Sequence, residues 1–240
     1  MPTVADLTAL YANFMLNPRP GPDVCRTCFN LTEGYEGCYA CAHVEHWADA
    51  VVPISYSVGG GQLHHALAQY KRLQGRAARR LEVGLAAVLW RFLERHEGCL
   101  ARAAQVEQFK LVTTVPSGER LRDDLHPLRR VVGETIAPTR SRYERLLLRS
   151  SKEARGRIFD GEKYAVTRQL SGEPVLLIDD TWTTGANAQS AAAALRQRGA
   201  GSVAVAVIGR HINRDWRSND RRLRQIPRPF DWSRCALCVS

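Results

Sequence analysis

The chain has 240 residues, of which 45% are hydrophobic and 24% charged, a composition near globular averages that excludes global disorder. No apolar run approaches the roughly 18 residues of a membrane span, and the first residues lack the charge and apolar run of a secretory signal. We therefore expect a cytoplasmic protein without a membrane span. Lysine and arginine number 34 against 24 acidic residues, a formal net charge of +10. The excess suits anionic partners such as phosphate esters or nucleic acid, although genome base composition alone can produce such an arginine bias.

The hydrophobic pattern changes along the chain. Residues 1–22 hold a short amphipathic stretch that ends in a proline-rich break, and residues 23–43 are rich in Cys and Gly with few aliphatic side chains. Beyond them, apolar runs and helical periodicity alternate. The expected strands are 51–57, 109–115, 175–178 and 202–208, and the expected helices are 62–96, 122–136 and 188–198. This alternation predicts an α/β fold, a three-layer sandwich with a mostly parallel sheet. The basic tail from 211 onward is expected to be irregular.

The segment VLLIDDTWTTGAN, residues 175–187, is the most informative. Ligands of parallel α/β sheets bind beyond the carboxyl ends of the strands, and this apolar strand ends in Asp179 and Asp180. The following turn leads into a helix, whose first amides form an anion site, and Gly185 allows the backbone to approach an anion closely. The two carboxylates can accept hydrogen bonds from a diol or hold a metal ion. The segment therefore suits a ribose 5-phosphate. A nucleotide triphosphatase would need a Gly-x-x-x-x-Gly-Lys-Ser/Thr loop, which the sequence lacks.

This segment resembles the 13-residue motif with which type I phosphoribosyltransferases bind 5-phosphoribosyl 1-pyrophosphate (PRPP). The resemblance implies that Asp179 and Asp180 hold the ribose 2- and 3-hydroxyls. It also implies that the turn cradles the 5-phosphate with Thr181, Trp182, Thr183, Thr184, Gly185, Ala186 and Asn187. Trp182 stands where a small aliphatic residue is usual, and Asn187 replaces the usual Thr or Ser. The indole is expected to narrow or cap the site.

The same resemblance implies a phosphoribosyltransferase that moves phosphoribosyl from PRPP to an unidentified acceptor and releases pyrophosphate. Mg2+ would bridge the pyrophosphate and the ribose hydroxyls. The pyrophosphate is expected on the loop after the 109–115 strand, at Pro116, Ser117 and Gly118. The basic segment 150–155 stands where type I enzymes carry a mobile loop. Lys152 and Arg155 are the catalytic candidates for stabilising the leaving pyrophosphate, with Lys71 as a further one. His64, His65 and His126 are available as an acceptor base, and the sequence does not single one of them out.

Six of the seven cysteines stand in Cys-x-x-Cys pairs, and an odd number without a secretion signal argues against a disulfide framework. The four N-terminal cysteines have the spacing of a structural zinc ribbon: Cys25, Cys28, Cys38 and Cys41. Zinc could supply on the order of 10 kcal/mol of folding energy to this coreless segment. His43 and His46 are alternative ligands. Cys235 and Cys238 could form a second half-site, replace one N-terminal pair, join a partner chain or lie in a loose tail.

A four-cysteine module followed by a PRPP loop resembles the ComF-like (competence protein F) phosphoribosyltransferases. Further similarity lies in Leu67–Gly75 (LAQYKRLQG), which resembles their Leu-Lys-Tyr-x-Gly segment, and in Val115-Pro116 after a strand. The Arg-Gly-Phe-Asn-Gln stretch usual after Val-Pro is replaced here by RLRDDLHPL from Arg120. The family's link to DNA uptake in competence implies a process rather than a reaction.

We therefore divide the chain into an N-terminal helix and zinc module (1–50), a phosphoribosyltransferase-like domain (51–210) and a basic tail (211–240). The alternative function is a catalytically silent PRPP-sensing regulator or DNA-processing accessory protein. Its nucleic-acid contacts would come from the tail arginines: Arg214, Arg217, Arg221, Arg222, Arg224, Arg228 and Arg234. A homo-oligomer is left open.

Overall fold

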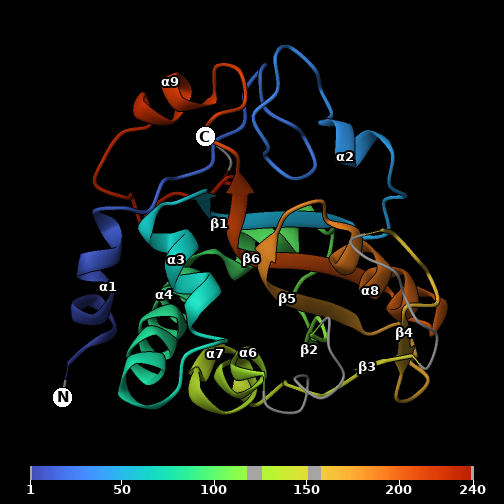
Figure 1. Ribbon diagram of the computed structural model, residues 1–240. Coiled ribbons are helices and arrows are strands. Elements are labelled where there is room, and N and C mark those ends of the chain that lie inside the picture. The colour runs from blue at the N-terminus through green and yellow to red at the C-terminus, as the bar shows by residue number, and fades with distance from the viewer. Residues whose placement is uncertain (1, 118–125, 151–157, 239–240) are drawn as a thin grey trace.

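The computed structural model describes residues 2–117, 126–150 and 158–238, and its centre is a four-stranded sheet (Figure 1). The strands are β1 (Ala50–Val58), β2 (Leu111–Thr114), β5 (Pro174–Trp182) and β6 (Ser202–Ile212). They are ordered β1-β6-β5-β2, and every pair is parallel. The expected α/β fold with a parallel sheet is confirmed.

Each face of the sheet is buried under a different set of elements, because alternate side chains of a strand point to opposite faces. Val52 and Ile178 pack with the first layer, which consists of α1 (Val4–Ala12), α3 (Gln62–Gln69) and α4 (Gly75–Ala103) with the short α6 (Pro127–Arg130), a π-helix (Val131–Thr135) and α7 (Ala137–Arg140). Leu177 and Val205 pack on the other face against α8 (Ala186–Gln197) and the Cys-rich segment. The strands thus read as continuous apolar runs because both faces are covered.

Two expected helices are interrupted. The long one between residues 62 and 96 divides into α3 and α4, since Gly75 has a φ of +69° and Gln74 is extended. The one expected over 122–136 consists, in its described part, of α6 and the π-helix, and the short α7 follows it. A Cβ on Gly133 would lie 2.6 Å from the Tyr143 ring. The backbone of the π-helix therefore packs directly against the Tyr143 side chain.

A second, two-stranded antiparallel sheet joins β3 (Leu147–Arg149) to β4 (Tyr164–Val166). It lies beside the edge strand β2, which forms an isolated parallel bridge from Val112 to Tyr143. These two strands bracket the basic segment 150–155.

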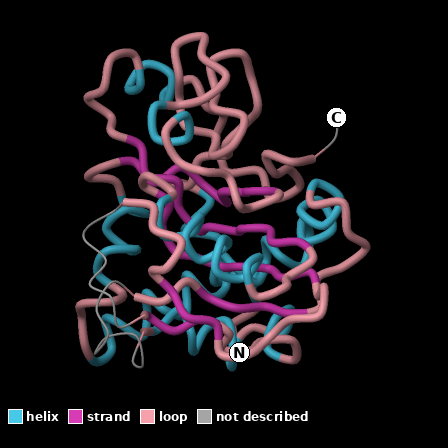
Figure 2. Tube along the Cα trace, turned by 90° about the vertical axis from the view of Figure 1, so that its right-hand side faces the viewer, coloured by secondary structure: helices cyan, strands magenta, loops and turns pink. Residues whose placement is uncertain are grey.

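The Cys-rich segment, with α2 (Tyr39–Ala42), and the C-terminal segment, with α9 (Asn219–Arg224), lie together beside the edge strand β1 (Figures 1 and 2). The Tyr56 hydroxyl of β1 donates to the Phe29 carbonyl at 2.8 Å. Apart from α9 and the end of β6, the tail is irregular, as expected, but it is packed against the protein, since Phe230 and Trp232 are buried. None of the helices in the described ranges combines the length and apolarity that crossing a bilayer requires.

Candidate functional site

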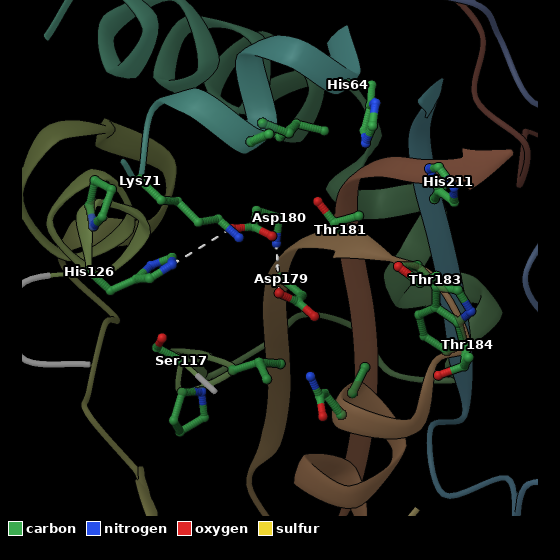
Figure 3. Close-up of a pocket in the computed structure, with 18 of the residues that line it drawn as sticks. His64, Lys71, Ser117, His126, Asp179, Asp180, Thr181, Thr183, Thr184 and His211 are labelled. Atoms are coloured by element: carbon green, nitrogen blue, oxygen red, sulfur yellow. Dashed lines mark hydrogen bonds and ion pairs between the residues drawn. The ribbon is translucent and has the colours of Figure 1, made fainter. Parts of the chain in front are cut away.

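A cavity of about 790 Å3 opens where the carboxyl ends of β2, β5 and β6 meet α3 and the start of α8 (Figure 3). It brings together most of the residues expected from the sequence: Pro116, Ser117, Asp179, Asp180, Thr181, Trp182, Thr183, Thr184, Gly185, Ala186 and Asn187. Lys71, the further catalytic candidate, also lines the cavity, whereas Gly118, Lys152 and Arg155 lie outside the described residues. The cavity is therefore a cleft at the strand ends, where ligands of parallel sheets bind.

The acidic pair lies within β5 rather than after it, because β5 continues pairing with β6 as far as Trp182. Asp180 is buried and accepts a 2.5 Å hydrogen bond from the Tyr70 hydroxyl. Its Oδ2 also forms an ion pair with the Lys71 ammonium, and His126 Nε2 lies 3.8 Å away (Figure 3). Burial by itself raises the pKa of Asp180, but Lys71 and His126 outweigh it and lower the pKa below its ordinary value. Asp180 is thus a carboxylate with a cationic partner.

Asp179 has a different environment, although it is the next residue. The Asp180 amide donates to its Oδ1 at 2.8 Å, and its carboxyl faces the cleft (Figure 3). Burial, followed by the negative charge of Asp180, raises the pKa of Asp179 to about 7. Two adjacent carboxyls with separated pKa values are typical of functional sites. A cation or hydrogen-bond donor entering the cleft would meet Asp179 first.

The raised pKa of Asp179 predicts a pH-dependent cost to stability. The unfolded carboxyl ionises near pH 4, whereas the folded one keeps its proton to about pH 7. Stability is therefore lost as the pH rises through this window, and the full cost, on the order of 1–4 kcal/mol, remains above it. We expect Asp179→Asn to raise the melting temperature at pH 8 by several degrees and to leave it unchanged at pH 4.

Melting curves at both pH values test this expectation. Asp215→Asn, which removes an exposed acid outside the cleft, serves as the control for charge. An equal shift of the Asp179→Asn variant at pH 4 and pH 8 would contradict the titration argument.

The backbone of the turn between β5 and α8 can approach an anion closely. Gly185 precedes the helix with a φ of +86°, and the Ala186 amide lies 3.3 Å from the Thr184 hydroxyl oxygen. A Cβ on Gly185 would lie 2.2 Å from Trp182 Cζ2. Trp182 is only 2% exposed. Its indole packs against the turn as part of the core, and the residue also lines the cleft.

Arg210 holds the same turn from β6, a role that the sequence analysis missed. Its guanidinium is buried and donates to the carbonyls of Trp182, Thr183 and His211 at 3.2, 3.0 and 2.6 Å. These bonds fix two carbonyls of the turn on the sheet side. The sequence contained one indication of this role, because Arg210 stands at the end of an apolar strand and a buried charge requires hydrogen-bond partners.

Lys163 of the segment before β4 reaches the first turn of α8. Its ammonium donates to Asn187 Oδ1 at 2.7 Å. Burial, followed by the charge of Arg149, lowers the pKa of Lys163. The expected donor Asn187 thus has its oxygen engaged, which leaves its amide nitrogen as the group that can donate to an anion. Nothing local in the sequence points to this contact.

The imidazoles of His64 from α3 and His211 from β6 stand 5.2 Å apart on the far side of the cleft from His126 (Figure 3). His64 and His126 were among the bases available from the sequence, whereas His211 was not, because its position depends on how β6 pairs with β1. The cleft therefore offers imidazoles on two sides.

Two clusters away from the cleft bring four metal-ligating atoms within 4.8 Å of one another. The first consists of the expected Cys25, Cys28, Cys38 and Cys41, all buried, with 3.6 Å between the sulfurs of Cys28 and Cys38. His43 and His46 instead lie against the carbonyls of Tyr39 and Cys41. The second consists of His96, Cys99, Cys235 and Cys238. Both clusters are compatible with structural zinc.

Most of the tail arginines are engaged within the protein. Arg217 forms an ion pair with Glu33, and Arg222 donates to the carbonyls of Thr32 and Asp23. Arg214, Arg224 and Arg234 form ion pairs with acids of the tail itself. Within the described ranges, only Arg221 and Arg228 of the seven have side chains without such a partner. The tail is therefore a poorer phosphate-backbone surface than its composition suggested.

Comparisons with known proteins add no identification: no protein-family model matches the chain, and no curated protein matches it. The cleft and the metal clusters are therefore the basis for assigning a function.

Proposed function

We propose that this protein is a type I phosphoribosyltransferase of the ComF-like kind, which binds PRPP with Mg2+ and transfers phosphoribosyl to a nitrogenous acceptor. One observation carries the proposal. A pair of carboxylates, a glycine with positive φ and the amino end of an α-helix of 12 residues line a single cleft at a strand end. Carboxylates can accept hydrogen bonds from hydroxyls, and the helix end attracts a phosphate.

In this reaction the bond from C1 to the pyrophosphate oxygen breaks, and its electron pair leaves with pyrophosphate. A bond forms between C1 and the acceptor nitrogen, whose proton passes to a base or to solvent. The protein needs no nucleophile for these steps. Its contribution is to position the two reactants and to stabilise the developing charges.

The residues of the cleft divide between the two ends of the substrate. The turn from Thr183 to Asn187 would hold the 5-phosphate, and Asp179 would accept hydrogen bonds from the ribose hydroxyls. Beside Asp180, Lys71 offers positive charge toward the pyrophosphate side and His126 offers an imidazole. Lys152 and Arg155 remain part of the proposal as stabilisers of the leaving group.

The carboxylate oxygens of Asp179 and Asp180 also fit Mg2+, which favours oxygen ligands from one or two carboxylates together with phosphates. When bound, Mg2+ would neutralise charge on the leaving pyrophosphate. The partly exposed Asp179 carboxyl is the better placed ligand, because Asp180 is already engaged by Tyr70 and Lys71.

Calorimetric titration of the full chain with PRPP and Mg2+ tests the binding half of the proposal. We expect binding by the unaltered protein, and a roughly 10–100-fold weaker affinity for Asp179→Asn and Asp180→Asn, the loss expected for hydrogen bonds to a charged group. Asp215→Asn, outside the cleft, should bind normally. Equal affinity in all variants, or no binding by the folded protein, would overturn the proposal.

A second candidate is a PRPP-binding regulator without turnover. The engagement of Asp180 by Tyr70 and Lys71 favours it, since that carboxylate must exchange a partner to meet the ribose. Pyrophosphate release with PRPP, Mg2+ and a panel of nitrogenous acceptors separates the two. Release that requires an acceptor supports the transferase, and tight binding without release supports the regulator.

A further inference from the structure

The carboxyl-terminal half of α4 and the end of the chain meet at a cluster that no step of the proposed reaction uses. His96 and Cys99 lie one turn apart on α4, and Cys235 and Cys238 come from the C-terminal segment, so 139 residues separate Cys99 from Cys238. One atom from each residue lies within 4.8 Å of the other three. Four donors of this kind from distant segments point to a shared ligand.

The distances between the donors match one tetrahedral ion. The Cys238 sulfur lies 3.5 Å from that of Cys235, 3.8 Å from that of Cys99 and 3.6 Å from His96 Nδ1. The Cys99 sulfur lies 3.9 Å from His96 Nδ1. Zinc bonds of about 2.3 Å to sulfur and 2.0–2.1 Å to nitrogen require tetrahedron edges of roughly 3.6–3.8 Å. The donors therefore surround a space of the size that zinc fills.

Hydrogen bonds from neighbouring groups favour the metal-binding forms of the four side chains, which are thiolates and a neutral imidazole. His96 Nε2 lies 3.0 Å from the Trp232 carbonyl oxygen, which places the ring proton on Nε2 and leaves Nδ1 as the ligand. The amides of Cys235 and Leu237 point at the sulfurs of Cys238 and Cys235, at 3.2 and 3.4 Å. Amide donors of this kind stabilise thiolates in a Cys-x-x-Cys turn.

Charge balance supports the same assignment. Three thiolates and one Zn2+ carry a net charge of −1, and an Arg102 Nη2 lies 3.4 Å from the Cys99 sulfur. A donor set of three sulfurs and one imidazole nitrogen is one of the common structural zinc sets, and thiolates favour zinc over hard cations such as Mg2+.

We propose that His96, Cys99, Cys235 and Cys238 form a second structural zinc site that clamps the C-terminal segment onto α4. The residues just before Cys235 also pack against the amino-terminal part of the chain. The Phe230 amide donates to the Ala12 carbonyl at 2.8 Å, and Asn17 exchanges hydrogen bonds with Asp231. The Arg91 guanidinium lies 4.5 Å from the Trp232 ring centroid. Zinc at this site would therefore attach the C-terminal segment to α4, and the contacts of that segment with Ala12 and Asn17 bring the amino-terminal part of the chain to the same place.

The test is the zinc content of the full chain, expressed with zinc, desalted and quantified against protein. We expect two zinc ions per chain, and one in either double variant, Cys25→Ser/Cys28→Ser or Cys235→Ser/Cys238→Ser. His96→Ala should lose most of the second ion. His43→Ala, a histidine outside both clusters, should keep two.

Thiol alkylation followed by mass spectrometry keeps the proposal testable if a variant fails to fold. In the unaltered, zinc-loaded protein, the half-buried Cys99, Cys235 and Cys238 should resist alkylation and become reactive once a chelator is added. One zinc per chain with rapid alkylation of these three cysteines would overturn the proposal. So would a disulfide between any two of them, seen as a loss of two mass units. None of these readouts depends on PRPP, so they stand apart from the proposed function.

Discussion

Replacing Gly185 by alanine should abolish measurable binding of PRPP while the chain stays folded. Gly185 has a φ of +86°, which costs a residue with a Cβ roughly 1–2 kcal/mol. The new Cβ would also lie 2.2 Å from Trp182 Cζ2, a separation that atoms do not tolerate. The indole is held in the core, so the turn must move instead. Its amides would then no longer converge on a phosphate, and we expect an affinity at least about 100-fold weaker by calorimetry.

Gly172 provides a matched control, because it shares the backbone conformation without the collision. Its φ is +88°, and a Cβ there would meet nothing within 4 Å. Gly172→Ala should therefore lose a similar amount of stability from the backbone and none of its affinity for PRPP. A double variant, Trp182→Val/Gly185→Ala, removes the obstacle and should recover part of the binding. Unchanged affinity in Gly185→Ala would show that the turn does not bind the phosphate.

The sheet could be predicted from the sequence because its strands are buried on both faces. Val175–Ile178 is a continuous apolar run, and the structure places it at the centre of the sheet between β2 and β6. The extension of β5 through Asp179 to Trp182 could not be predicted, since local pattern treats two acids as the end of a strand. Pairing with β6, as between Thr181 and Gly209, outweighs that local preference.

The turn of the candidate site was visible in the sequence, whereas its supports were not. Asp179 to Asn187 are contiguous, so their chemistry can be recognised without a structure. Arg210, Lys163 and Tyr70 reach them from positions 24 to 110 residues away in the chain. Such contacts depend on strand order and helix placement, which no local pattern encodes.

One cysteine cluster could likewise be predicted from the sequence, whereas the other could not. Two closely spaced Cys-x-x-Cys pairs specify a complete set of ligands, and the first cluster was predicted residue by residue. Cys235 and Cys238 supply only half a set. Their partners, His96 and Cys99, belong to a helix that reads as ordinary packing surface, so only the folded chain brings the second cluster together.

The first cluster is also connected to the cleft. Gln189 Oε1 of α8 accepts hydrogen bonds from the amides of Trp47 and Ala48, at 2.8 and 3.0 Å. These residues lie a short distance after the Cys-rich segment in the chain, and Gln189 lies one turn into the helix whose amino end faces the cleft. A change in the fold of the Cys-rich segment should therefore reach the position of α8.

We propose that Cys25, Cys28, Cys38 and Cys41 bind structural zinc, and we expect its loss to unfold residues 23–43 and to weaken PRPP binding. This segment contributes few aliphatic side chains to the core, and its four thiols are buried at the base of α2. Structural zinc contributes roughly 10–16 kcal/mol in isolated peptides. Even a third of that amount should lower the melting temperature of a chain of this size by about 10 °C. The variant Cys38→Ser/Cys41→Ser, followed by calorimetry and zinc analysis, measures both effects.

The double variant at the other cluster, Cys235→Ser/Cys238→Ser, is the matched comparison. It also removes two thiols, but its cluster contacts α4 and the chain ends rather than α8, so PRPP affinity should stay within about twofold of the unaltered protein. Tryptic cleavage after the exposed Arg26 should accelerate only in Cys38→Ser/Cys41→Ser. A melting temperature and cleavage rate unchanged by that variant would mean that packing alone holds the Cys-rich segment. If the Cys-rich segment unfolds while PRPP still binds normally, the hydrogen bonds of Gln189 do not couple the fold of that segment to the cleft.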